Sequence, residues 1–172
     1  IGNLEFFNGK LLGKDVVLVE GGIGKVNAAI CATLIINHFK VDKVLFTGVA
    51  GGVNPNINIG DIVIGNDLIE HDFDSTAFGY ELGQIPRMDT YIFKADQNLV
   101  DIACNVAEKE FGKYRVCVGR IVSGDEFVAS IERIKWLRDT FEADCTEMEG
   151  AAVAHVCHIF NMPFLIIRAI SD

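Results

Sequence analysis

The sequence predicts an α/β fold in which helices cover a central, largely parallel sheet. Short segments rich in Val, Ile, Leu and Phe alternate along the chain with longer segments of helical periodicity. The strand-like segments are almost continuously apolar, which is typical of strands that are buried on both faces. Half of the 172 residues are hydrophobic, which is enough for one core and predicts a single domain.

Six segments have the composition of strands, because they are rich in β-branched and aromatic residues and are bounded by Gly, Asp or Asn. They are residues 4–12, 15–21, 43–50, 60–73, 115–124 and 164–172. Four further segments have the periodicity of helices, namely residues 25–40, 97–111, 132–141 and 150–160. No repeat or low-complexity segment separates these elements, so residues 1–172 are predicted to form one domain.

Composition restricts the classes of partner. The net charge of -9, with no basic run to offset it, disfavours nucleic acid and anionic membranes. The five cysteines are odd in number and lie within apolar runs, which favours reduced thiols over disulfides. The apolar runs are too short to span a membrane, and no signal peptide is visible. We expect a cytoplasmic protein that acts on a small molecule.

Both ends of the sequence interrupt the alternating pattern. No strand–helix unit precedes the first predicted strand, and the sequence stops at Asp172, directly after an apolar strand. Such a strand needs a helix to cover it. We therefore expect the domain to include a further strand–helix segment before residue 1 and a helix after Asp172.

Ligands of open α/β sheets bind beyond the carboxyl ends of the strands. Four segments of this kind are EGGIGK (20–25), TGVAGG (47–52), SGDEF (123–127) and ISD (170–172). A fifth, EME, places Glu147 and Glu149 where an apolar helix begins. Burying a carboxylate costs several kcal/mol unless it is paired, so this placement needs a reason. We expect the five segments to form one site.

The glycine-rich segments do not carry a known nucleotide motif. EGGIGK lacks the spacing of a P-loop, and Asn27 replaces the third glycine of the dinucleotide fingerprint, which disfavours an oxidoreductase. Considered alone, each glycine segment fits a tight turn as well as it fits close approach of a ligand.

Two segments resemble metal sites superficially. His155 and His158 are spaced for two zinc ligands beside Cys157, but no further ligand motif accompanies them, so we expect packed core histidines and no metal. The carboxylates of residues 70–74 (EHDFD) offer cation ligands, but we expect a solvated strand end there.

The motifs GGIGKVNAA, TGVAGG, GDIV, HDFDSTAFGYELGQIP, VSGDEF and EMEGAAVAHVCHIFNMPFLIIRAISD occur in this order along essentially the whole chain. Together they resemble the 5'-methylthioadenosine/S-adenosylhomocysteine nucleosidases of the nucleoside phosphorylase type I superfamily. The resemblance implies a single-domain, three-layer, phosphorylase/hydrolase-like α/β fold with a central mixed, largely parallel sheet flanked by helices. It also implies an enzyme without a cofactor that hydrolyses the N-glycosidic bond of 5'-substituted adenosines to adenine and the 5-thioribose sugar.

The resemblance assigns roles to residues of three segments. Asp172 is expected to donate a proton toward N7 of adenine, and Ser171 and Arg168 are placed to orient it. Glu149 is expected to hydrogen-bond the ribose hydroxyls, with Met148 against the sugar. A carboxylate near the cationic sugar of the transition state also lowers the barrier electrostatically.

Further substrate contacts are implied individually. Gly51 is expected to approach the substrate, Phe127 to stack on adenine, and Val128 to offer backbone contacts to it. Ile23 is expected to border the 5'-thio pocket, and Glu147 is a further candidate substrate-binding residue.

Residues in the aromatic loop imply an assembly. Phe78 and Pro86 match positions that reach a neighbouring subunit's pocket, which implies a homodimer. The water-activating glutamate of the family is expected in a segment before residue 1.

Alternatives to hydrolysis stay open at this point. They are a phosphorylase acting on purine nucleosides or uridine, and a non-catalytic nucleoside-binding module. The resemblance implies that a phosphorolytic relative would carry an arginine where this chain has Phe46, and Val49 is also apolar, so a phosphate dianion would lack donors there.

Overall fold

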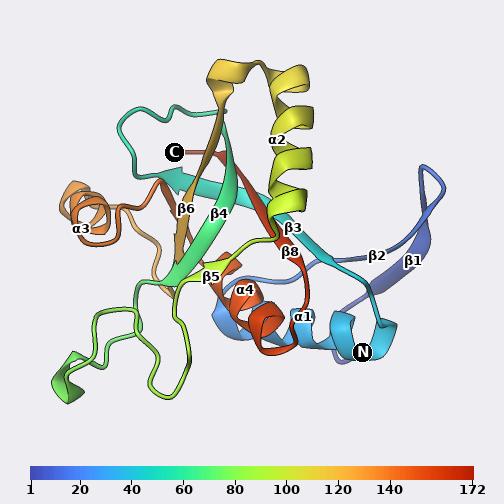
Figure 1. The fold of residues 1–172 in the computed structure, drawn as a ribbon, viewed down its shortest axis with the longest axis horizontal. Helices are drawn as coiled ribbons and strands as arrows, with labels where there is room; N and C mark the ends of the chain where they lie inside the picture. Colours follow the sequence, from blue (N-terminus) through green and yellow to red (C-terminus); the bar gives the residue numbers. More distant parts are fainter.

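The structure, a computed structural model, describes residues 1–172 (Figure 1). The strands are β1 (Phe6–Leu11), β2 (Lys14–Val19), β3 (Val44–Gly52), β4 (Ile62–Glu70), β5 (Phe93–Lys94), β6 (Val116–Ser123), β7 (Cys145–Glu147) and β8 (Phe164–Ile170). The α-helices are α1 (Lys25–Phe39), α2 (Gln97–Phe111), α3 (Ile131–Phe141) and α4 (Gly150–Ile159), with short 3-10 turns η1 (Thr76–Phe78) and η2 (Lys113–Arg115).

The central sheet is mixed, as the family resemblance implies. Its strand order is β5-β4-β6-β7-β3-β8, with parallel pairs β4–β6, β6–β7 and β3–β8 and antiparallel pairs β3–β7 and β4–β5. The first residues of β4 also pair with β8, so the strands close into a ring. The predicted α/β class is confirmed, and the closed sheet is one form of it. β5 and β7 were not predicted, because two or three residues show no periodicity.

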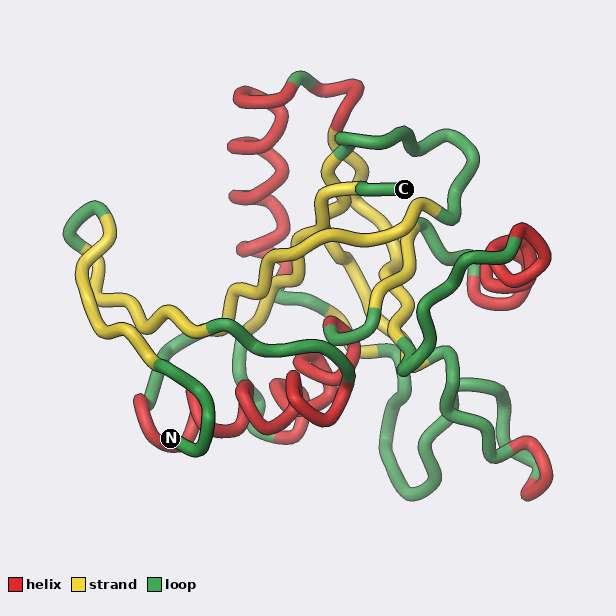
Figure 2. The backbone as a smooth tube through the Cα atoms, turned by 180° about the vertical axis from the view of Figure 1, so that it is seen from behind, coloured by secondary structure: helices red, strands yellow, loops and turns green.

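The first two predicted strands lie outside this sheet. β1 and β2 form a separate antiparallel hairpin that extends away from the body of the molecule (Figure 2). Its two-residue turn, Leu12 and Gly13, has positive φ at both positions, as a tight hairpin turn with the strands' natural twist requires. The expectation that the second strand belongs to the central sheet is therefore wrong, since composition identifies a strand but not its partner.

Helices cover the sheet on several sides. α1 and α4 lie side by side over the largest apolar cluster, which the sheet supplies together with both helices. α2 packs on β4, β6 and β8 through a second cluster. α3 begins at Ile131, one residue before the predicted start, because the side chain of Ser130 accepts a hydrogen bond from the backbone N–H of Arg133. None of the helices combines the length and the apolar character that a membrane crossing requires.

Candidate active site

Because the sheet is mixed, the carboxyl ends of its strands do not all lie at one edge. β7 runs antiparallel to β3, whereas β8 runs parallel to it. The carboxyl ends of β3 and β8 therefore point away from those of β4, β6 and β7. The predicted segments therefore do not all follow strand ends at one edge, but Gly51 near the end of β3 pairs with Thr146 of β7, so the segments around Asp172 and around Glu149 lie on neighbouring strands.

Asp172 lies at the exposed ends of β3 and β8. Ser171 Oγ donates to Asp172 Oδ1 at 2.6 Å, and the backbone N–H of Gly52 donates to the Asp172 carbonyl at 2.8 Å. The backbone N–H of Ser171 is fixed in turn by the carbonyl of Ala50 at 3.0 Å. A Cβ atom on Gly51 would lie 3.5 Å from Asp172 Oδ2. The carboxyl group is thus held in place, with Oδ2 over Gly51.

Glu147 occupies a buried polar centre against the start of α4. Its carboxylate accepts from Arg168 through Nε at 3.1 Å and through the second guanidinium nitrogen, and from the hydroxyl of Ser123. The backbone N–H of Gly150 donates to both of its oxygens at 2.8 and 2.9 Å, and that of Glu149 donates at 3.1 Å. Arg168 therefore binds Glu147, which differs from the expectation that it orients Asp172.

Arg168 itself is 1% exposed and lies in a shaped slot. Its guanidinium lies 4.4 Å from the centre of the Phe46 ring. A Cβ atom on Gly48 would lie 2.8 Å from one of its nitrogens, so glycine at this position leaves room for the guanidinium. Two glycines of the TGVAGG segment thus contact charged groups: Gly48 lies against Arg168, and Gly51 lies against Asp172.

Glu149 has far fewer partners than Glu147. It stands at the N-cap position of α4 and accepts one hydrogen bond from the backbone N–H of Gly24 at 2.9 Å. Burial raises the pKa of Glu149, and the nearby Glu147 carboxylate raises it further, whereas the Gly24 N–H opposes the shift. Gly24 has φ of 90°, a conformation that glycine adopts without strain. The GGIGK turn therefore brings a donor to the half-buried carboxylate.

Residues 70–74 match the predicted solvated strand end in part. Glu70 and His71 are buried, whereas Asp72 and Asp74 are exposed. Lys25 at the start of α1 places its Nζ 3.1 Å from Glu70 and 2.6 Å from Asp72. Glu70 and Asp72 therefore share one cation, a lysine from a distant segment.

This lysine also joins the loop after β6. The backbone N–H of Lys25 donates to Asp125 Oδ1 at 2.8 Å, and the backbone N–H of Asp125 donates to Asp72 Oδ2 at 2.9 Å. Although burial opposes ionisation, hydrogen bonds from Lys25 and Asp125 hold the pKa of Asp72 below its usual value. The GGIGK turn and the SGDEF loop are therefore neighbours. The only sequence signal was a lysine after a glycine turn and two acids after a strand.

The remaining predicted site residues differ in exposure. Ile23 and Phe127 are 75% and 77% exposed on these neighbouring loops. Val128 packs against the apolar cluster beneath α3, and Met148 is half-buried between the two glutamates. The exposed apolar side chains of Ile23 and Phe127 are therefore available to a ligand.

The aromatic loop that carries Phe78 and Pro86 projects from the body of the molecule (Figure 1). Phe78 is 84% exposed, whereas Pro86 is half-buried.

The two histidines of α4 are partly exposed, which differs from the expected core positions. His155 stacks on Phe93 with ring centres 4.8 Å apart, and its Nδ1 lies 2.9 Å from Glu70. His158 pairs through Nε2 with Asp89 at 2.9 Å. Each ring therefore has a carboxylate partner.

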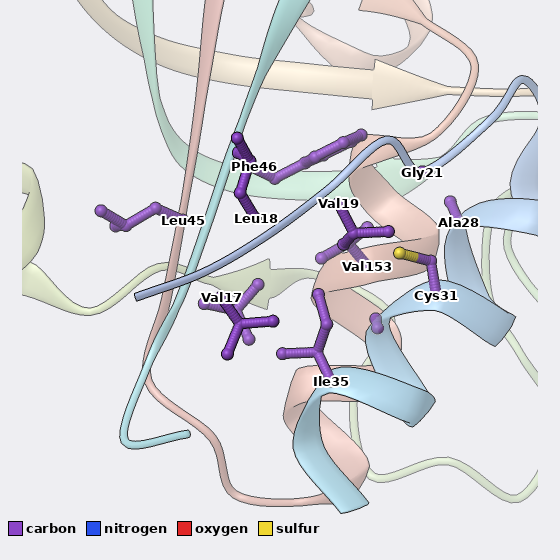
Figure 3. Close-up of a pocket in the computed structure, with 12 residues that line it drawn as sticks. Val17, Leu18, Val19, Gly21, Ala28, Cys31, Ile35, Leu45, Phe46 and Val153 are labelled. Atoms are coloured by element: carbon purple, nitrogen blue, oxygen red, sulfur yellow. The ribbon is translucent and has the colours of Figure 1, made fainter. Parts of the chain in front are cut away.

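An apolar cavity lies apart from these polar groups, between β2, α1, β3 and α4 (Figure 3). Val17, Cys31, Ile35 and Val153 are among its lining residues, of which 11 of 12 are hydrophobic. A ribose needs polar partners for its hydroxyls, and this lining supplies none from side chains. The cavity is therefore not the nucleoside site that the sequence predicts.

Comparison with known proteins agrees with the motifs. The model of the phosphorylase superfamily matches residues 1–172. A 5'-methylthioadenosine/S-adenosylhomocysteine nucleosidase of Geobacillus sp. (strain WCH70) is 47% identical over 100% of this chain and 74% of its own length. The nucleosidase of Neisseria meningitidis, solved with methylthio-immucillin-A, has a TM-score of 0.94 at 44% identity and covers 100% of this chain and 74% of that chain. A futalosine hydrolase of Helicobacter pylori also superposes with a TM-score of 0.94, at 37% identity over 100% of this chain and 72% of that chain. The chain belongs to the phosphorylase superfamily and, within it, to the family of 5'-methylthioadenosine/S-adenosylhomocysteine nucleosidases.

Proposed function

We propose that the protein hydrolyses the N-glycosidic bond of 5'-methylthioadenosine, S-adenosylhomocysteine and related 5'-substituted adenosines. The products are adenine and the corresponding 5-thioribose sugar. The observation that carries the proposal is the exposed Asp172 carboxyl group, which is fixed by Ser171 and has its Oδ2 over Gly51. Membership of the nucleosidase family supports the same reaction.

Cleavage of this bond makes two demands on the site. The sugar becomes cation-like in the transition state, and the departing adenine must take up a proton. We assign proton donation toward N7 to Asp172, since its Oδ2 is directed away from Ser171 and over Gly51. We assign none of these carboxylates as the base that activates water, since that glutamate is expected in a segment before residue 1.

We assign the ribose to Glu149. Its carboxylate has one backbone donor, so it retains acceptor positions for the sugar hydroxyls. Its raised pKa means that burial disfavours the ionised form in the free protein. A cation-like sugar supplies the missing charge, so the interaction strengthens as the bond breaks.

The expected role of Glu147 changes. Its oxygens accept hydrogen bonds from Arg168, Ser123 and the start of α4, so it is engaged before a substrate arrives. We propose that Glu147 positions the backbone of Glu149 and does not contact the nucleoside.

Apolar residues form the walls of the proposed substrate site. We propose that Phe127 stacks on adenine, that Val128 supplies backbone contacts, and that Ile23 borders the 5'-thio group. We propose that Met148 packs against the sugar. Aromatic and aliphatic surfaces suit the flat base and the thioether.

We further propose a cytoplasmic homodimer. Phe78 is exposed on a loop that projects from the molecule, as a residue that enters a neighbouring subunit's pocket must be, and Pro86 lies in the same loop. The five cysteines are all unpaired, which suits a reducing compartment.

Adenine release in phosphate-free buffer tests hydrolysis directly. Phe46 packs against Arg168, and Val49 is an exposed apolar side chain, so neither offers a donor to a phosphate dianion. We expect 5'-methylthioadenosine to release adenine without phosphate and to leave a free sugar. Inosine and uridine serve as control substrates. Strict dependence on phosphate, with accumulation of a sugar 1-phosphate, contradicts the proposal.

A further inference from the structure

Lys25, the first residue of α1, is the cation of a network that joins three loops. Its side chain is 18% exposed, and its Nζ lies 3.1 Å from Glu70 and 2.6 Å from Asp72. Burial opposes the ionisation of Glu70, but hydrogen bonds from His155 and Lys25 hold its pKa below the usual value. One lysine therefore stabilises two neighbouring carboxylates that would otherwise repel each other.

The backbone of Lys25 is fixed by the loop after β6. Its N–H donates to Asp125 Oδ1 at 2.8 Å, and the N–H of Asp125 donates to Asp72 Oδ2 at 2.9 Å. The same Asp125 oxygen lies against Gly24, where a Cβ atom would be 3.1 Å away. The side chain and the backbone of Lys25 therefore hold the GGIGK turn at two points.

This turn carries the hydrogen-bond donor of Glu149. Gly24 directly precedes Lys25, and its N–H donates to Glu149 Oε1 at 2.9 Å. Burial raises the pKa of Glu149, and this hydrogen bond opposes the shift. A displacement of the turn by about 1 Å would lengthen the bond beyond its effective range. The orientation and the ionisation of Glu149 thus depend on where the turn lies.

A second connection joins Lys25 to the helix that follows Glu149. Glu70 binds Lys25 through Oε2, and its Oε1 lies 2.9 Å from Nδ1 of His155. His155 belongs to α4, and Glu149 stands at the N-cap position of that helix. The turn and the carboxylate are therefore held in register by two routes, one through Gly24 and one through Glu70.

We propose that Lys25 is a positioning residue, which holds the N–H of Gly24 against the ribose carboxylate of Glu149. This inference rests on the proposed function, because that function assigns the ribose to Glu149. Lys25 acts through the turn and does not contact the substrate. Its ion pairs with Glu70 and Asp72 therefore serve the reaction as well as the fold.

The test compares Lys25→Met with Asp125→Ala. Both variants release the turn, but they change the local charge in opposite directions. NMR titration of the ligand-free protein measures the pKa of the Glu149 carboxyl group, with Glu149→Gln to assign its signal. We expect both variants to raise this pKa, because the Gly24 N–H no longer opposes the effect of burial. A direct effect of charge would instead lower the pKa in Asp125→Ala, which removes a negative charge.

The charged groups that face Glu149 stay in place in both variants, since these groups are Glu147 and Arg168. Asp125 is exposed, so Asp125→Ala should fold even if Lys25→Met does not. A Glu149 pKa that is lowered or unchanged in Asp125→Ala overturns the inference.

Steady-state kinetics adds a second readout. We expect Lys25→Met and Asp125→Ala to lower kcat/KM for 5'-methylthioadenosine by about 10-fold, because Glu149 is misplaced. The control is Lys135→Met, which removes a lysine from an exposed pair with Asp139 and should change neither quantity. Wild-type kcat/KM in Asp125→Ala, or an equal loss in Lys135→Met, overturns the inference. Failure of the wild type to release adenine refutes the proposed function instead, while the titration of Glu149 still tests Lys25.

Discussion

The carboxylate at the buried centre of the site, Glu147, and those at its rim, Glu149 and Asp172, differ in how many hydrogen-bond donors surround them. At the centre, Glu147 is surrounded by donors, among them the buried guanidinium of Arg168. At the rim, Glu149 has one backbone donor and a raised pKa, and Asp172 is held through Ser171. Two glutamates separated by one methionine thus have different physical tasks.

The difference indicates how this fold supports a reactive site. A carboxylate that is saturated with donors cannot strengthen its interactions further when charge develops on a substrate. A carboxylate with free acceptor positions can do so, at the cost of some stability in the free protein. The central carboxylate therefore fixes the backbone, and the rim carboxylates meet the substrate.

Removal of the central cation is the largest expected perturbation. Arg168→Met leaves Glu147 buried without its counter-ion, and we expect a loss of about 3 kcal/mol or more in the free energy of unfolding. Denaturant unfolding measures it. The matched control is the double variant Arg168→Met with Glu147→Gln, which removes both charges and should recover part of the loss. Unchanged stability in the single variant contradicts the structural role of the pair.

At the rim, Asp172→Asn should spare the fold and impair the chemistry. Asparagine can still accept from Ser171, so thermal unfolding should be near that of the wild type. We expect kcat to fall by roughly 10²-fold or more, because the purine leaving group loses its proton donor. Steady-state kinetics with 5'-methylthioadenosine measures it, with Ser171→Ala as a milder control. Wild-type turnover removes Asp172 from the mechanism.

Much of the secondary structure was predictable, and the pairing was not. Continuous apolar runs identified the longer strands and the helices to within a few residues. The short strands β5 and β7 were not predicted, because they form only by pairing with strands far along the chain. The hairpin of β1 and β2 has strand composition, but composition does not report which sheet a strand joins.

The site divides in the same way. The family resemblance selected both Glu147 and Glu149, but two glutamates in one motif carry no local signal that distinguishes their roles. Their separate roles depend on Arg168, which lies 21 positions from Glu147. The pairing of Glu70 with Lys25 was not predicted, because this cation lies 45 positions before Glu70. Long-range pairing of charges is decided by the fold, not by local pattern.

The central claim is that Glu149 serves the chemistry and Glu147 serves the fold. Parallel measurement of kcat and of the free energy of unfolding, for Glu149→Gln and Glu147→Gln, tests it most directly. Burial raises the pKa of Glu149, so its ionised form weakens the folded state as pH rises through that pKa. At neutral pH we therefore expect Glu149→Gln to keep or slightly gain stability.

The same variant should lose kcat by about 10-fold or more, and lose nucleoside affinity less, because the carboxylate favours the cationic transition state. Glu147→Gln should instead lose about 3 kcal/mol of stability, since Arg168 stays buried without a counter-ion. The account is contradicted if Glu149→Gln retains wild-type kcat, or if it destabilises the protein as much as Glu147→Gln does.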